Sequence, residues 1–314
     1  ANAHTNDHPA DKYYVPHESP WPIYGSATLF VFMIGLCGWL NEWYGPWIFA
    51  VGVLMLVGLF VGWFAVVIGE HQRGMYNMQV DKSFRMGMMW FIFSEVMFFA
   101  AFFGALFYAR QLSVPWIGGE GVKFLNGLLL WQDYSPAWPT NGPEALGPRD
   151  DGSFETIPAF GLPAINTAIL LLSGVTITIA HHALKEGNRR ILNIFLAATF
   201  LLGFLFLGLQ AEEYIHAYTE LGLTLSTGIY GSTFFMLTGF HGMHVTLGAI
   251  MLLVIWFRTM KGHFTPQRHF GFEAVANLGA GQEAFGFETF GEHHLMAVEE
   301  DVDIFDLTAF DAAH

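Results

Sequence analysis

Long apolar runs separated by short polar stretches dominate the chain. A helix that crosses a bilayer core of about 30 Å needs about 20 predominantly apolar residues. The runs that meet this need are flanked by aromatic residues typical of a membrane surface, such as Trp21, Trp43 and Trp256. The pattern predicts an all-α fold, a polytopic membrane helix bundle, with six transmembrane helices at 22–40, 46–68, 84–108, 162–182, 191–210 and 228–257.

Composition supports lipid as the solvent of this chain. Only 13% of its residues are charged and 53% are hydrophobic, whereas soluble domains carry about 25% charged residues. The net charge of -14 argues against a nucleic-acid partner, which would need basic patches. The single cysteine, Cys37, allows neither an internal disulfide nor a cysteine metal cluster. Charged residues and Pro16 interrupt segment 1–21 before any apolar core, so it does not read as a signal peptide.

The polar turns alternate in charge along the chain. The turn after the first span has no base, the turn after the fifth carries Glu212, Glu213 and Glu220, and the long loop 109–161 has more acids than bases. Bases follow the second, fourth and sixth spans: Arg73, Lys82, Arg85, Lys185, Arg189, Arg190, Arg258, Lys261 and Arg268. The positive-inside rule therefore predicts a cytoplasmic N-terminal segment. The proline-rich loop 109–161 is predicted to be extracytoplasmic, irregular and a candidate docking surface.

Glu95 is the most unusual residue inside a predicted span. An ionised carboxylate at mid-depth is costly, so the neutral form is favoured there. Two interpretations remain open: an acid that handles protons or is linked to lipid headgroups, and a protonated glutamate hydrogen-bonded to a neighbouring helix.

Histidines are the next candidates. His241 and His244 lie three residues apart and share one helix face, so a shared metal is conceivable, but no second histidine pair occurs at mid-depth. His181 and His182 are adjacent and diverge by about 100° on a helix. Hydrogen-bonded structural histidines are the favoured interpretation of all four. For Glu212, with Glu213 and Tyr214, the favoured interpretation is a solvated helix end.

Eight short motifs, taken together and in order, closely resemble subunit III of the haem–copper (aa3-type) cytochrome c oxidases. They are Ser94–Phe99, Leu162–Thr167, Leu170–Val175, Ala180–His182, Leu209–Tyr214, Gly231–Phe235, Thr238–Val245 and His269–Ala274. The resemblance covers residues from about 20 to about 276.

The resemblance implies a non-redox subunit of a proton-pumping oxidase that takes electrons from cytochrome c and reduces O2. It implies no catalytic residue, metal or cofactor in this chain, with haem a and copper in oxidase subunits I and II. It also implies a bacterial inner membrane location, bound phospholipid, and respiratory supercomplex components as further partners. The family fold has seven helices, arranged as a two-helix bundle and a multi-helix bundle with a lipid-filled cleft.

Residue by residue, Glu95 matches the family's carbodiimide-reactive membrane carboxylate, which is linked to proton uptake. Trp63, Glu70, Arg258 and His263 match positions around bound phospholipid headgroups. Without the resemblance, Arg258 reads as a simple interfacial anchor. Val66 and Gly69 replace further charged lipid contacts of the family near the second span, so the lipid site differs there.

The resemblance divides the chain into segment 1–21, the membrane domain 22–276 and the C-terminal segment 277–314. The family continues with a seventh helix, but 277–314 has nine acids, no Lys or Arg and no spanning apolar run. Two interpretations stand: an acidic cytoplasmic tail, and a C-terminal sequence that is in error, through a frameshift or through inference from incomplete data. The second is favoured because losing a packed helix would expose the bundle.

Two other functions compete with this one. A proton-coupled transporter using Glu95 is disfavoured because the halves of the chain show no repeat. Subunit III of a related quinol oxidase is a family-level alternative.

Overall fold

The computed structural model describes residues 13–15, 18–264 and 271–276, and every regular element in these ranges is helical. Six of the helices are long and apolar enough to cross a membrane, which confirms the predicted all-α membrane fold for the described residues. They are α1 (Trp21–Leu40), α2 (Trp47–Gln72), α3 (Met78–Tyr108), α5 (Leu162–Lys185), α6 (Arg189–Thr219) and α7 (Gly228–Met260). The acidic segment 277–314, and residues 1–12 of the N-terminal segment, lie outside the described residues.

Several helices extend beyond the apolar runs that predicted them. α3 begins at Met78 because the side chain of Asn77 accepts a hydrogen bond from the backbone N–H of Val80, at 2.9 Å, and so caps the helix. α6 continues to Thr219 because residues 210–219 include good helix formers, Gln, Ala and Glu, and no proline. Hydropathy locates the apolar part of a helix and misses its polar ends.

The chain forms two compact units, Ala1–Gly87 and Met88–His314, and α3 begins in the first and continues in the second. In the first unit, α1 and α2 pack as a hairpin. Gly35 and Gly52 lie at this contact: a Cβ on Gly52 would be 2.5 Å from Cα of Phe32, and one on Gly35 would overlap the backbone of Phe49. Glycine is required here because the two backbones approach too closely for a side chain.

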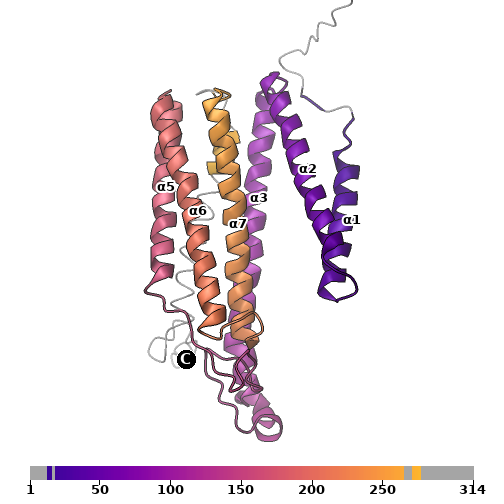
Figure 1. Ribbon diagram of the computed structural model, residues 1–314, viewed down its shortest axis with the longest axis vertical. Coiled ribbons are helices and arrows are strands. Elements are labelled where there is room, and N and C mark those ends of the chain that lie inside the picture. Colours follow the sequence, from indigo (N-terminus) through magenta and orange to yellow (C-terminus); the bar gives the residue numbers. More distant parts are fainter. Residues whose placement is uncertain (1–12, 16–17, 265–270, 277–314) are drawn as a thin grey trace, which may run out of the picture. The chain divides into compact units, whose positions relative to one another are not determined.

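In the second unit, α5, α6 and α7 lie side by side (Figure 1). Hydrogen bonds join the helices at successive levels. Thr176 of α5 bonds Thr199 of α6 at 2.8 Å, and the Gln210 side chain of α6 donates to the Thr238 carbonyl of α7 at 3.0 Å. Lipid tails are as apolar as leucine side chains, so close packing and polar contacts of this kind hold membrane helices together.

The long loop 109–161 is only partly irregular, and the sequence prediction was wrong for its first part. That part contains η1 (Ala109–Ser113), α4 (Val114–Ile117), η2 (Gly121–Lys123) and η3 (Asn126–Leu130). The remainder of the loop is hydrogen-bonded to the connection between α6 and α7. Arg149 donates to the Glu220 carbonyl at 2.5 Å, and the Glu155 backbone N–H donates to the Leu221 carbonyl at 2.9 Å. The loop thus satisfies backbone groups at one end of the bundle.

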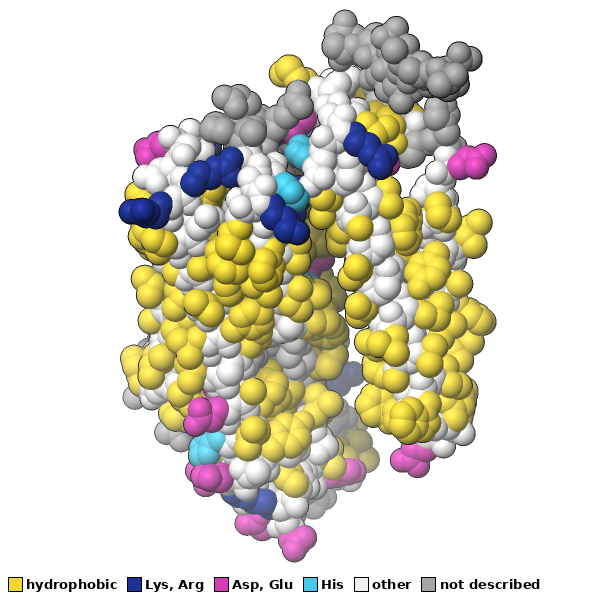
Figure 2. Space-filling model, turned by 45° about the horizontal axis from the view of Figure 1, so that its top comes forward, with side chains coloured by type: hydrophobic (Ala, Val, Ile, Leu, Met, Phe, Trp, Pro, Cys, Tyr) yellow, Lys and Arg dark blue, Asp and Glu magenta, His cyan; other side chains and the backbone are white. Residues whose placement is uncertain are grey.

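Many hydrophobic side chains along the helices are exposed, while Lys and Arg gather near helix ends (Figure 2). In the second unit, Lys185, Arg189 and Arg190 lie where α5 ends and α6 begins, and Arg258 and Lys261 lie where α7 ends. We call this part of the second unit the basic end. A polytopic membrane protein is expected to have this surface, because apolar residues face lipid and charged residues face water.

Candidate functional site

Glu95 lies near the middle of α3 and contacts the middle of α7. Its Oε2 lies 2.5 Å from Nε2 of His244. The two side chains are mostly buried, with 24% and 20% of their surfaces exposed. Phe98 and Phe99 pack against the imidazole, with ring centroids 6.0 and 5.3 Å away. The pair is a polar contact set among aromatic rings.

The second nitrogen of His244 determines how many protons the pair holds. Nδ1 lies 2.6 Å from the carbonyl oxygen of Phe240, which can only accept, so Nδ1 carries a hydrogen. Nε2 and Glu95 Oε2 then share one further proton, held either as a carboxylic acid facing a neutral imidazole or as a carboxylate facing an imidazolium. Both arrangements have zero net charge, which suits mid-membrane, where an isolated charge is costly.

The sequence allowed two interpretations of Glu95: a proton-handling acid, and a packing residue hydrogen-bonded to a neighbouring helix. The structure supplies the neighbouring helix and its partner, His244, which both interpretations allow. One signal was present in the sequence: each residue lies near the centre of its long helix, so the two occur at similar depth.

His241 and His244 do not converge on a common point. His241 is only 2% exposed, and its ring lies 5.7 Å from that of Phe206 on α6, whereas His244 contacts α3. The described residues contain no group of three or more His, Cys, Asp or Glu that could hold a metal ion.

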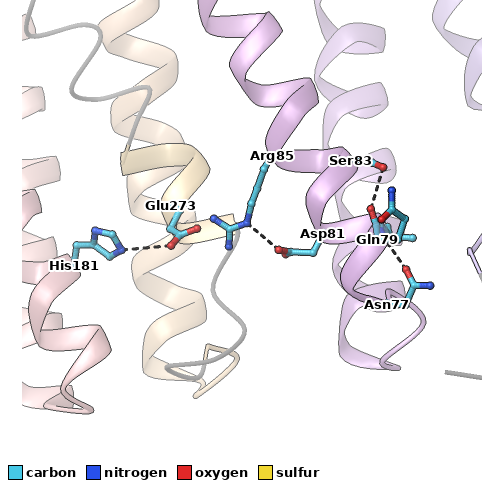
Figure 3. A network of polar contacts seen from close by, with 8 residues as sticks. Asn77, Gln79, Asp81, Ser83, Arg85, His181 and Glu273 are labelled. Atoms are coloured by element: carbon cyan, nitrogen blue, oxygen red, sulfur yellow. Dashed lines mark hydrogen bonds and ion pairs between the residues drawn. The ribbon is translucent and has the colours of Figure 1, made fainter. Parts of the chain in front are cut away.

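His181 and His182 diverge, as their adjacency on α5 predicted. His182 is exposed, while Nε2 of His181 lies 3.7 Å from the carboxylate of Glu273 in the helical turn 271–276. Figure 3 shows these two side chains pointing toward each other at the end of α5. The ring of Phe272 packs beside His181 with centroids 5.7 Å apart. His181 therefore takes part in docking the 271–276 turn.

The interpretation of Glu212, Glu213 and Tyr214 as a solvated helix end was wrong for the last two. α6 continues past them to Thr219, and Glu213 is only 5% exposed whereas Glu212 is exposed. Tyr214 hydrogen-bonds the Thr238 hydroxyl at 2.5 Å. Because a helix extends beyond its apolar run, residues at the end of that run can still face a neighbouring helix.

In the first unit, Glu70 lies near the end of α2 and accepts hydrogen bonds from two tyrosines. Tyr14 donates to Oε1 at 3.0 Å and Tyr76 donates to Oε2 at 2.7 Å. Burial and the bonds to Glu70 raise the pKa of both phenols above the usual 10.0, so both stay protonated as donors. Trp63, two turns earlier on α2, is 47% exposed. Neither tyrosine was singled out from the sequence, because only the fold brings Tyr14 to α2.

In the second unit, Arg258 and His263 lie at the basic end. The Arg258 guanidinium lies over the ring of Phe264, 4.5 Å from its centroid. His263 follows the end of α7 and is partly exposed. Burial, together with the charges of Arg258 and Lys261, lowers the pKa of His263 below its usual 6.5. Of Arg258 and His263, it is therefore Arg258 that carries a positive charge near pH 7.

Comparison with known proteins shows similarity over most of the chain. A family model described as cytochrome c oxidase subunit III matches residues 11–121 and 146–278. The sequence is 38% identical over 270 residues to a protein named cytochrome c oxidase subunit 3 from Squalus acanthias, covering 86% of this chain and 91% of the relative. Proteins with the same name from Coturnix japonica and Oryctolagus cuniculus are each 37% identical over the same shares of the chains.

Proposed function

Because the chain belongs to the cytochrome c oxidase subunit III family, we propose that it is a non-redox accessory subunit of a proton-pumping oxidase. The observation that carries the proposal is the family match, which includes all six long helices. In this proposal, electrons pass from cytochrome c to O2 in subunits I and II, which hold haem a and copper. The named relatives favour this function over a transporter or a quinol oxidase subunit.

Depletion of this subunit from the purified complex tests the accessory role. We expect the depleted complex to keep its haem absorbance and most of its initial oxygen consumption, because the metals belong to its partners. We also expect its activity to decay sooner during turnover than that of complex taken through the same detergent steps without depletion. Haem loss in proportion to the subunit removed would overturn the non-redox assignment.

The Glu95–His244 pair supports a role in proton uptake. The two side chains share one proton between Oε2 and Nε2, and the proton can move between these atoms without changing the net charge of the pair. Gaining or losing a net proton would leave the pair charged, so it passes protons at low electrostatic cost inside the membrane only when one proton arrives as another leaves. We assign Glu95 the role of a proton-linked carboxylate and His244 that of its partner.

Phospholipid is the second proposed ligand. Arg258, at the end of a spanning helix, has the charge and depth to pair with a lipid phosphate, and His263 lies five residues further on. In the first unit, Glu70 and the exposed Trp63 provide a carboxylate and an indole at a helix end. Because both oxygens of Glu70 accept tyrosine hydroxyls, Glu70 would meet a headgroup only through its remaining lone pairs.

The depressed pKa of His263 makes lipid binding pH-dependent. The imidazole is neutral above about pH 6.5 and gains a charge beside Arg258 only at lower pH. We expect the affinity of the complex for phosphatidylglycerol to rise by up to about fivefold between about pH 8 and about pH 5.5, the size of an exposed ion pair. The control is His263→Gln, which removes the titrating group and should flatten this profile. An unchanged profile in that variant would mean that another group is responsible.

The charge pattern also supports an orientation. We propose that the basic end lies in the cytoplasm, that the N-terminal segment lies there too, and that the membrane is a bacterial inner membrane. The loop that closes the opposite end of the bundle is then extracytoplasmic.

A further inference from the structure

At the basic end, the first turn of α6 holds the end of α7 through Arg189. Its Nη2 donates to the Phe264 carbonyl at 2.7 Å, and its Nη1 donates to the Thr259 carbonyl at 3.4 Å. The two carbonyls lie on either side of Met260, where α7 ends. One planar guanidinium therefore spans the point at which the helix becomes a turn, and fixes the path of the turn.

Asn193 reinforces this connection one helical turn further along α6. Its backbone carbonyl accepts from the Trp256 indole at 3.1 Å, and its side-chain oxygen accepts from the Thr259 hydroxyl at 3.0 Å. Arg189 and Asn193 are four residues apart and share one face of α6. Together they fix the last turn of α7 on both sides of Arg258.

Phe264 connects this arrangement to Arg258. Its ring is only 1% exposed and lies under the Arg258 guanidinium, 4.5 Å from Cζ to the ring centroid. Gly271 closes in from the 271–276 turn, since a Cβ there would lie 3.4 Å from Nη1 of Arg258. By fixing the Phe264 carbonyl, Arg189 therefore also fixes the Phe264 ring against which the Arg258 guanidinium packs.

The Nε atom of this guanidinium is buried and has no acceptor among the residues that the structure describes. No carboxylate of the described chain pairs with Arg258. Buried polar groups are ordinarily hydrogen-bonded, and a bound water, ion or ligand is one explanation for an exception. An immobilised planar cation with unused donors suits a phosphodiester or phosphate group, whose oxygens accept from the fork of the guanidinium.

We propose that Arg189 is a positioning residue for an anionic phosphate site at Arg258, acting through the Phe264 carbonyl and ring. The inference rests on the proposed phospholipid role of Arg258 and adds the residue that fixes its geometry. Arg189 acts by its two carbonyl contacts, and its own charge is secondary. A lysine at position 189 keeps the charge, but its single ammonium on a flexible stem cannot hold two carbonyls in a fixed fork.

The test measures phosphate-group binding to the intact oxidase complex. Delipidated complex is titrated with phosphatidylglycerol in mixed micelles and, separately, with inorganic phosphate, and bound ligand is counted by native mass spectrometry. We expect Arg189→Lys and Arg189→Gln each to weaken binding by about tenfold, the effect of one lost charge-assisted contact. Arg190→Gln is the matched control: Arg190 is also exposed at the basic end and makes no hydrogen bond within the described residues, so binding should stay at the wild-type level.

Arg258→Gln separates the inference from the function on which it rests. Wild-type binding in Arg258→Gln would refute the phosphate site itself. If Arg258→Gln loses binding while Arg189→Lys binds like the wild type, only the positioning role is refuted. The positioning role is also refuted if Arg189→Gln and Arg190→Gln weaken binding equally. The probe that binds identifies the source of the phosphate group.

Phe264→Leu keeps the test decisive if the Arg189 variants do not assemble. The Phe264 carbonyl remains available to Arg189, while the ring beneath the guanidinium is lost. We expect weaker binding in a complex whose mass still includes this subunit, and wild-type binding would contradict the proposal.

Discussion

His244→Phe is expected to weaken retention of this subunit in the oxidase complex by about 1–3 kcal/mol, because it leaves the buried carboxyl of Glu95 without its partner. Phenylalanine fits the site sterically, since Phe98 and Phe99 already pack against the imidazole. Glu95→Leu should have a similar effect by leaving Nε2 of His244 without Glu95. The measurement is the urea concentration at which half of the subunit leaves the complex.

The double variant Glu95→Leu with His244→Phe distinguishes the two roles of the pair. Replacing both partners by apolar groups of similar shape is often nearly neutral, so retention should return close to the wild-type value. If the pair also carries a proton, the retained double variant should still take up protons more slowly and lose activity sooner in turnover. Ser94→Ala is the control, because among the described residues the Ser94 hydroxyl bonds only to its own helix, at the Phe91 carbonyl.

The outcome decides between the interpretations of Glu95. Full recovery of proton uptake and catalytic lifetime in the double variant would show that the pair has a packing role only. Recovered retention with slow proton uptake would support the proton-linked role. Retention that fails to recover would show that the two residues are not coupled as the geometry indicates.

Gly35→Leu is expected to remove most of this subunit from the assembled complex. Even a Cβ at this position would overlap the backbone of Phe49, so α1 and α2 would have to separate along their contact. Overpacking a close contact typically costs about 1–3 kcal/mol, and backbone against backbone leaves less room to adjust than side chain against side chain. The amount of subunit recovered per haem in purified complex measures the effect.

Gly69→Ala is the matched control for Gly35→Leu. Gly69 lies in α2 of the same unit, and apart from its chain neighbours and the adjacent backbone of α2, no described atom lies within 4 Å of a Cβ placed there. Alanine favours the helix, so recovery should equal or slightly exceed the wild-type value. Normal recovery of Gly35→Leu would contradict the close contact between α1 and α2.

The sequence by itself determined the solvent, the helical class and the six spans. This follows because a backbone in lipid must satisfy its hydrogen bonds within each helix, so a spanning segment can be recognised from its own apolar length. Family membership could also be read from short motifs in order, and the comparisons confirm it. The start of α3 and the end of α6 were not predicted, because polar residues extend each helix beyond its apolar run.

Only the tertiary structure decided which side chains meet. Glu95 and His244 are 149 residues apart, and Arg189 reaches the Phe264 carbonyl 75 residues away. The burial of Glu213 beside exposed Glu212 likewise depends on which face α6 turns toward its neighbours. In a lipid-exposed bundle apolar residues lie on every side of a helix, so hydropathy carries no information about rotation. The rotation of each helix, fixed by close packing and polar contacts between helices, therefore places the partners of Glu95 and Arg189.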